Sequence, residues 1–433
     1  MSQDERRDGS GRQRGRARVE GRTQRSAAAP SGRARHGDPA RAAAFEVLRQ
    51  VDGSDAYANL VLPPLLRSRH LTGRDAAFAT ELAYGTLRLQ GRYDAILAIA
   101  TGRPIAQLDA PVRDVLRLGA HQLLGMRVPA HAAVSETVAL TRALVGAGPA
   151  QLVNAALRRV SEKELDAWLA LLTESAQDDT ERLAVVHSHP AWIVRAFRQA
   201  LAAEGRDPGE LEALLEADNA APAVTLVVRP GLADRDQVLA GLSGGEAGRW
   251  TPTAIRMAAG DPAQVAGVAG GRVGVQDEGS QLVALALASA PTLPGAGTAG
   301  APVGERWLDL CAGPGGKSAL LGAVASAAGA HLVANEIAPH RAALVERSVA
   351  ALPPGTVEVR TGDGTTIGAQ EPGVYDRVLV DAPCTGLGAL RRRPESRWRR
   401  TPGDLGRLST LQRELLSSAL DATRPGGVVA YVT

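Results

Sequence analysis

Residues 309–317 read Asp-Leu-Cys-Ala-Gly-Pro-Gly-Gly-Lys and complete a largely apolar segment that begins at Arg306. This pattern is typical of a β-strand that turns sharply into a helix, because Gly313, Gly315 and Gly316 let the backbone approach a ligand closely. A helix that begins at such a turn presents free backbone N–H groups. The stretch therefore predicts the first strand of an α/β sheet, with a binding turn at its carboxyl end.

Further strand-like segments follow this turn, with helical patterns between several of them, at 331–335, 357–360, 377–380 and 428–432. Strands that alternate with helices indicate a parallel sheet whose ligands lie at the carboxyl ends of the strands. Acidic residues stand at or just after four of these strand ends, namely Asp309, Glu336, Asp363 and Asp381. One such residue is often a surface residue, but four at successive strand ends indicate a site. We interpret residues 271–433 as a Rossmann-like α/β domain.

Three classes of ligand use a glycine turn of this kind. A phosphate-binding P-loop requires glycine at position 311, which is cysteine, and a dinucleotide fingerprint requires glycine at position 318, which is serine. S-adenosylmethionine has no phosphate, so a shorter turn suffices. Glu336 stands 23 residues after Gly313, where its carboxylate can accept from both ribose hydroxyls. The pattern favours S-adenosylmethionine, with Asp363 near the adenine amine and Asp381 near the methionine part.

The segment Asp381-Ala382-Pro383-Cys384 carries a possible nucleophile. Cytosine C5 is a poor nucleophile, so an enzyme that methylates it first adds a thiolate to C6. A thiol at a strand end near a sulfonium cation is placed for activation. On this chemistry alone, Cys384 is the candidate for attack. Cys311, inside the cofactor turn, is interpreted as a structural residue.

An arginine-rich segment follows at 391–400, with six arginines in ten residues and one tryptophan. Arginine pairs with phosphate and stacks on bases, and an indole can cover a base. A solvated charged loop is the alternative interpretation. Because the segment is next to the predicted catalytic strand, we favour RNA contact by Arg391, Arg392, Arg393, Arg397, Trp398, Arg399 and Arg400.

The N-terminal part divides into three predicted regions. Residues 1–36 hold ten arginines and four acidic residues, a net charge of +6 against +3 for the whole chain, and are predicted to be a disordered basic tail that aids RNA encounter. Apolar residues at helical spacing predict an all-α domain over 37–165. The β-branched run 223–228 predicts a strand, so residues 166–270 are interpreted as a small α+β connector.

Composition limits the class of protein. A chain of 433 residues is expected to be multidomain. The sequence contains no apolar run of about 18 residues, and its arginine-rich start differs from a secretory signal, so we expect no membrane partner. Its two cysteines both lie inside motifs and favour a reducing cytoplasm over a disulfide framework. We predict no metal site and a monomer.

The two motifs at 309–317 and 381–386 resemble the signatures of RNA cytosine-C5 methyltransferases that use S-adenosylmethionine. Residues 128–138 and 152–159 resemble the helical RNA-binding domain of the antitermination factor NusB, which is also found at the front of the small-subunit ribosomal RNA methyltransferase B (Sun/Fmu) proteins. The resemblance covers residues 38–433. It implies a NusB-like domain, a connector and a Rossmann-like methyltransferase domain that acts on small-subunit ribosomal RNA, with cofactor contacts from Cys311, Ala312, Gly313, Pro314, Gly315, Gly316, Lys317, Glu336, Asp363 and Asp381.

The resemblance also assigns different roles to the cysteines. In that family the cysteine of the Pro-Cys motif assists product release, so Cys384 takes that role, while a cysteine after the fifth strand attacks. Here that strand reads Val-Val-Ala-Tyr-Val-Thr and reaches Thr433. We therefore expect the attacking cysteine after Thr433 and expect this chain to be truncated, without the last strands of the fold, and inactive as given. The alternatives are methylation at another RNA position, or a non-catalytic RNA-binding module that retains the cofactor.

Overall fold

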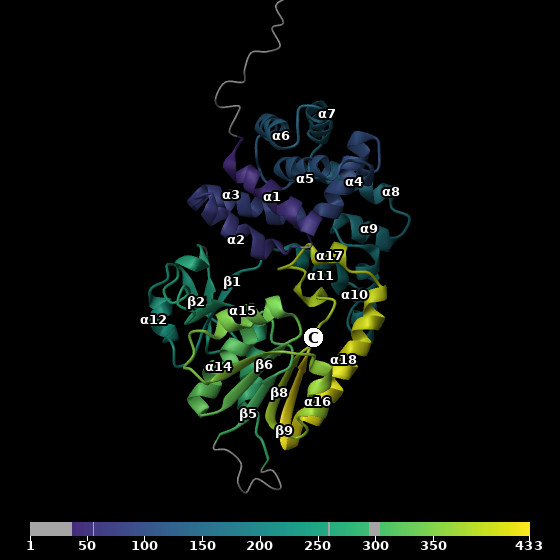
Figure 1. Cartoon of the computed structure of the whole chain (residues 1–433). Helices are drawn as coiled ribbons and strands as arrows, with labels where there is room; N and C mark the ends of the chain where they lie inside the picture. The colour runs from purple at the N-terminus through teal and green to yellow at the C-terminus, as the bar shows by residue number, and fades with distance from the viewer. Residues whose placement is uncertain (1–36, 55, 259, 294–303) are drawn as a thin grey trace, which may run out of the picture.

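The computed structural model describes residues 37–54, 56–258, 260–293 and 304–433. The predicted basic tail, residues 1–36, lies outside them. The described residues form a helical region, an antiparallel sheet and a parallel sheet flanked by helices (Figure 1). None of the described helices is both long and apolar enough to span a membrane.

Helices run from Pro39 to Asn219 on both sides of the predicted boundary at 165, and Leu183, Val194 and Leu215 beyond it belong to a core of their own. Beyond that boundary, Trp168 and Leu172 are buried in the same core as the first seven helices. The Trp168 indole also donates a hydrogen bond to the Val160 carbonyl at 3.0 Å. The helices are α1 (Pro39–Ser54), α2 (Ala58–Ser68), α3 (Gly73–Arg88), α4 (Gln90–Thr101), α5 (Ala110–Leu124), α6 (Ala130–Leu144), α7 (Ala150–Val160), α8 (Leu165–Ser175), α9 (Asp179–Val186), α10 (Ala191–Ala203) and α11 (Glu210–Asn219), with a 3-10 turn η2 (Ile105–Gln107) after α4.

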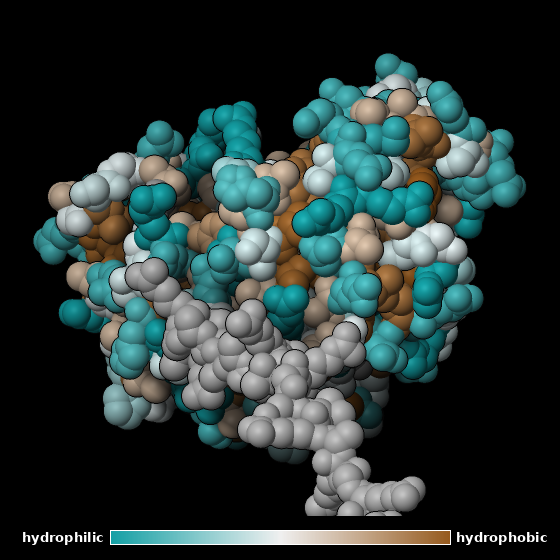
Figure 2. Space-filling model, turned by 90° about the horizontal axis from the view of Figure 1, so that it is seen from above, coloured by the Kyte–Doolittle hydropathy of each residue, from teal (hydrophilic) through white to brown (hydrophobic). Residues whose placement is uncertain are grey.

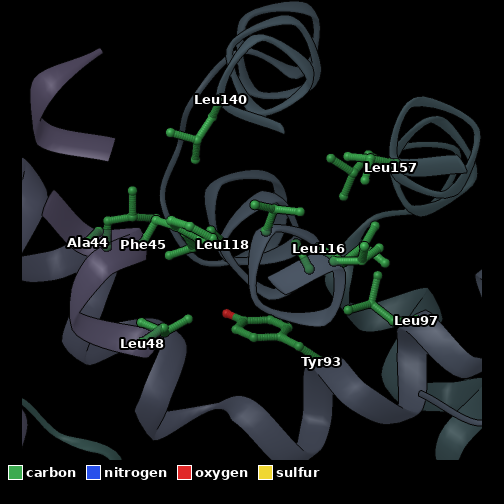
Figure 3. Close-up of a cluster of buried hydrophobic side chains, with 14 of the residues drawn as sticks. Ala44, Phe45, Leu48, Tyr93, Leu97, Leu116, Leu118, Leu140 and Leu157 are labelled. Carbon is green, nitrogen blue, oxygen red and sulfur yellow. The ribbon is translucent and has the colours of Figure 1, made fainter. Parts of the chain in front are cut away.

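The core of this region is aliphatic, as the low aromatic content requires. Leucines from α1, α4, α5, α6 and α7 point toward one another around the ring of Tyr93 (Figure 3). The Tyr93 hydroxyl has a hydrogen-bond partner within this apolar core, His121 Nδ1 at 2.8 Å. The outer face, seen from above, is mostly hydrophilic with smaller hydrophobic areas between (Figure 2). The apolar stripes predicted from helical spacing therefore supply the core of this region.

The second region is a four-stranded antiparallel sheet in the order β2-β3-β1-β4. One of its two inner strands is the β-branched run predicted from the sequence, and Leu226 and Val228 on it are buried against Ile255 and Met257. The elements are β1 (Val224–Val228), α12 (Arg235–Ala240), β2 (Gly245–Ala247), β3 (Ala254–Met257), η3 (Pro262–Gln264) and β4 (Val273–Val275).

The third region is a five-stranded parallel sheet in the order β7-β6-β5-β8-β9, as the alternation of strands and helices predicts. Helices α13, α14 and α15 cover one face, and α16 and α18 cover the other (Figure 1). The elements are α13 (Glu278–Ser289), β5 (Arg306–Asp309), α14 (Gly316–Ala328), β6 (His331–Glu336), α15 (Pro339–Val349), β7 (Val357–Thr361), η4 (Gly364–Thr366), α16 (Ile367–Gln370), β8 (Tyr375–Asp381), η5 (Leu387–Ala389), α17 (Ser396–Arg399), α18 (Gly403–Ala422) and β9 (Thr423–Val432).

Candidate cofactor and RNA site

The glycine turn joins β5 to α14 at the carboxyl edge of the parallel sheet. The Ala312 N–H donates to the Asn335 carbonyl at 2.8 Å, which fixes the turn against the next strand. Gly315 has φ +104°, a conformation that favours glycine. A side chain on Gly315 would also collide with Ser348 of α15. The backbone therefore passes through a space that only glycine fits, and α14 begins there with its first N–H groups facing the edge of the sheet.

Glu336, the last residue of β6, holds one end of this turn. Its carboxylate is 3% exposed and accepts hydrogen bonds from the N–H groups of Gly313 at 3.0 Å and Ala338 at 3.1 Å. A Cβ on Gly313 would collide with this carboxylate. The structure therefore places Glu336 directly at the turn, where the sequence predicted a ribose acceptor.

Arg341 of α15 is a residue at this turn that the sequence analysis missed. Its guanidinium donates to the Gly313 carbonyl at 2.6 Å and lies 3.5 Å from the Glu336 carboxylate. The signal for it was its place in the first turn of the helix that follows Glu336. Arg341 neutralises part of the negative charge at this end of the turn.

The first turn of α14 connects the ends of β5 and β8. The Ser318 hydroxyl donates to Asp309 Oδ2 at 2.7 Å, and Lys317 Nζ donates to Asp381 Oδ2 at 2.7 Å. Asp309 is 1% exposed, and its Oδ1 has no hydrogen-bond partner among the described residues. Burial raises the pKa of Asp309 to about 7, although the Ser318 hydrogen bond opposes this shift. Two of the predicted cofactor-binding residues, Lys317 and Asp381, are thus held together.

Asp363 lies after β7, at the same edge of the sheet. Its Oδ1 accepts from the Thr365 N–H at 2.9 Å and the Thr365 hydroxyl at 2.8 Å, so the side chain caps the short helix η4. The residue is exposed. Capping engages one oxygen of the carboxylate, and contact of the other oxygen with adenine stays a prediction.

The two cysteines have different surroundings. Cys384 is partly exposed in the loop after β8, and Gln412 of α18 holds that loop by donating to the Pro383 carbonyl at 2.8 Å. Burial raises the pKa of Cys311 to about 12, and the nearby carboxylates of Asp309 and Glu336 add to this shift. Cys311 is therefore a protonated thiol at neutral pH and is unsuited to attack. The described residues contain no group of three or more His, Cys, Asp or Glu side chains that could hold a metal ion.

The arginine-rich segment lies against the helical region, and part of its predicted role is wrong. Arg397 is fully buried, and its guanidinium donates to the carbonyls of Arg88 at 2.9 Å, Ser188 at 3.1 Å and Asp218 at 2.9 Å, and to Asn219 Oδ1 at 2.8 Å. Loss of hydration on burial lowers its pKa to about 10. Arg397 therefore joins two domains of the protein and is not available to contact RNA.

Two other arginines of the segment also contact other parts of the protein. Arg399 donates to the carbonyls of Val51 at 2.9 Å and Ala56 at 2.6 Å, and Arg392 lies 2.6 Å from the Asp277 carboxylate. Glu395, a buried residue that the sequence analysis did not single out, accepts from the Ala58 N–H at 3.1 Å. We call residues 389–400 the docking segment, because these contacts attach it to the helical region and to the start of α13.

The remaining predicted RNA contacts are accessible. Arg391 and Arg393 are exposed, Arg400 is half-buried, and Trp398 is 38% exposed. Trp398 and Arg400 line a cavity of about 480 Å³ between the docking segment and helices of the helical region. The docking segment therefore buries some of its cations and presents others beside the loop that carries Cys384.

The chain is similar to proteins of one family over most of its length. Residues 301–433 match the family model described as 16S rRNA methyltransferase RsmB/F, and residues 38–162 match the NusB family. "Putative methyltransferase Rv1407" of Mycobacterium tuberculosis (strain ATCC 25618 / H37Rv) is 51% identical over 397 residues, which cover 92% of this chain and 83% of that protein. "Ribosomal RNA small subunit methyltransferase B" of Sodalis glossinidius (strain morsitans) is 32% identical, with 91% and 85% covered.

A solved structure supports the fold. The crystal structure of PH0851 superposes with a TM-score of 0.75 and covers 91% of this chain and 85% of that chain. The two sequences are 20% identical, so this likeness concerns the fold alone.

Proposed function

The chain belongs to the 16S rRNA methyltransferase RsmB/F family, and we propose that it methylates C5 of a cytosine in small-subunit ribosomal RNA through a covalent cysteine adduct. Its cofactor is S-adenosylmethionine. The observation that carries the proposal is the glycine turn closed by Glu336 beside the Asp-Ala-Pro-Cys loop. We further propose that the protein acts as a monomer in the cytoplasm, where its ribosomal RNA substrate and reduced thiols are found.

The charges at the turn fit this cofactor. Asp309, Glu336 and Asp381 place three carboxyl groups around it, and the nearby cations Lys317 and Arg341 are paired with two of them. The carboxyl groups therefore outnumber the cations at this turn, which suits a ligand with positive charge better than a phosphate chain. The bound cofactor supplies an electrophilic methyl group on a sulfonium. Glu336 accepts from its ribose, and the turn 311–317 holds the ligand against the sheet edge.

The residues of the chain would share the remaining chemistry. A thiolate adds to C6 of the cytosine, which makes C5 nucleophilic toward the methyl group. After transfer, the C5 proton leaves, the S–C6 bond breaks and its electron pair returns to sulfur. We assign Cys384 to this release step, as the family resemblance implies, and assign the attack to the second cysteine of the family's pattern. The high pKa of Cys311 argues against attack by that thiol.

RNA contact is proposed for the accessible part of the docking segment. Arg391, Arg393 and Arg400 are placed to pair with phosphates, and Trp398 to cover a base that has left its stack. The buried arginines of the same segment hold these side chains next to the Cys384 loop. The NusB-like helical region supplies a second RNA-binding surface in this proposal.

Disruption of the gene in its host tests the reaction. Small-subunit ribosomal RNA should then lose 5-methylcytosine at one position, as read by bisulfite sequencing. A plasmid copy with Cys384→Ser should accumulate a covalent protein–RNA adduct on a denaturing gel, because release fails after attack. An unchanged methylation pattern, or loss of a different modified nucleoside, would contradict the C5 assignment. A Cys384→Ser protein that never forms an adduct would make Cys384 the nucleophile.

A further inference from the structure

A buried glutamine outside the predicted site residues faces the cofactor turn. Gln276 precedes α13 and is 8% exposed, yet neither its Oε1 nor its Nε2 has a hydrogen-bond partner among the described residues. Its backbone is fixed at both ends of the residue, since its N–H donates to the Thr225 carbonyl at 3.0 Å and its carbonyl accepts from Gln281 Nε2 at 3.0 Å. A buried amide with no hydrogen-bond partner destabilises the folded state, so a bound ligand is the expected partner of this side chain.

The amide lies against the first residue of α14. A Cβ built on Gly316 would lie 3.9 Å from both Cδ and Nε2 of Gln276, and these are its nearest neighbours. At the other end of the same turn, Gly313 contacts Glu336. The turn therefore extends between two buried polar side chains, with the carboxylate of Glu336 at one end and the unpaired amide of Gln276 at the other.

We propose that Gln276 binds the amino-acid end of S-adenosylmethionine, an inference that rests on the proposed function. A ligand whose ribose meets Glu336 at Gly313 extends along the turn toward Gly316. The Gln276 amide then donates from Nε2 to the α-carboxylate and accepts at Oε1 from the α-ammonium group, which matches its one donor and one acceptor end. The α14 N-terminus favours the same carboxylate, because its N–H groups carry partial positive charge.

Calorimetry with two ligands tests this assignment. S-adenosylhomocysteine contains the ribose and the amino-acid end, whereas 5′-methylthioadenosine contains the ribose without the amino acid. Gln276→Met keeps the side-chain volume and removes both hydrogen-bonding atoms. It should weaken S-adenosylhomocysteine on the order of 10- to 100-fold and leave methylthioadenosine unchanged. Glu336→Ala, the matched control, should weaken both ligands to a similar extent.

A stability measurement separates binding from a structural role. Without ligand, Gln276→Met should raise the midpoint of thermal unfolding, because it replaces an unpaired buried amide by an apolar group. A lower midpoint together with equal losses for both ligands would show that Gln276 only supports the turn, and unchanged affinities would remove it from the site. Failure of the wild-type chain to bind either ligand would instead overturn the cofactor assignment of the proposed function.

Discussion

The carboxylate of Glu336 has both a structural role and a proposed binding role. It closes the glycine turn through the Gly313 N–H, and it is the group that we expect to meet the ribose of the cofactor. A carboxylate can do both, because its two oxygens offer about four acceptor sites. The close contact with Gly313 also explains why this position has no side chain.

We predict that Glu336→Ala lowers the affinity for S-adenosylmethionine by about 1–3 kcal/mol, because two buried ribose hydroxyls lose a charged acceptor. Isothermal calorimetry measures this loss. Glu346→Ala, on the same helix as Arg341 but exposed, is the control and should bind as the wild type does. If the Glu336 variant binds with unchanged affinity, Glu336 is not part of the site.

Asp309 predicts a pH dependence of stability. Burial raises its pKa from 3.8 to about 7, so between these values the folded state keeps a proton that the unfolded state has lost. The contribution of Asp309 to the free energy of unfolding therefore falls as pH rises from about 4 to about 7. Asp309→Asn removes the titrating group. The free energy of unfolding of this variant minus that of the wild type should therefore be larger by a few kcal/mol at pH 8 than at pH 4. Denaturant unfolding at both pH values measures this, and a constant difference would contradict the raised pKa.

At the scale of elements, the docking segment connects the loop after Cys384 to the helical region. Arg397 reaches carbonyls of α3 and α11 and of the turn between α9 and α10, so one side chain joins three parts of the helical region to the methyltransferase domain. A cation buried this deeply is tolerated because four protein acceptors replace its water. The segment thereby fixes where the helical region lies relative to the loop that carries Cys384 (Figure 1).

We predict that Arg397→Met destabilises the protein by on the order of 3 kcal/mol, because several buried acceptors lose their partner. Arg391→Met is the matched control from the same segment. Arg391 is exposed, so its loss should change stability by less than about 0.5 kcal/mol while weakening RNA binding. Denaturant unfolding and a filter-binding assay measure the two effects. Equal stability of the two variants would contradict the docking role of Arg397.

These two arginines show where sequence reasoning succeeds and where it ends. The turn at 309–317 and the parallel strands were predictable, because glycine positions and apolar periodicity are local properties of the chain. Which of the arginines are buried and which are exposed was not predictable, because the six side chains in these ten residues are identical and differ only in the parts of the fold that surround them. Gln276 was missed for the same reason: its unpaired amide becomes visible only when α14 lies beside it.

At the scale of the whole molecule, the NusB-like helical region and the parallel sheet that carries the cofactor turn are separate regions of the chain. The helical region lies at one end of the molecule and the carboxyl edge of the parallel sheet faces it, with the docking segment between them (Figure 1). The antiparallel sheet joins the same assembly through Arg229, which donates to the Ser348 carbonyl at 2.9 Å, while the Ser348 hydroxyl donates to the Pro314 carbonyl of the turn at 3.1 Å. All three regions thus contact the elements that build the site.

The basic segment 1–36 leads to a prediction about the whole protein, although it lies outside the described residues. Its net charge of +6 exceeds that of the entire chain, so it should add affinity for RNA mainly by releasing counterions. A plot of the logarithm of the binding constant against the logarithm of salt concentration measures this effect. Deleting the segment should make the slope of that plot shallower by about 0.7 per lost phosphate contact on single-stranded RNA.

Replacing its ten arginines by lysines keeps the charge and should preserve this slope. Because phosphate contacts carry no sequence information, the methylated position should stay the same in the deleted protein. Bisulfite sequencing of the ribosomal RNA checks this point, and methylation that moves to another cytosine would mean that the segment selects the site.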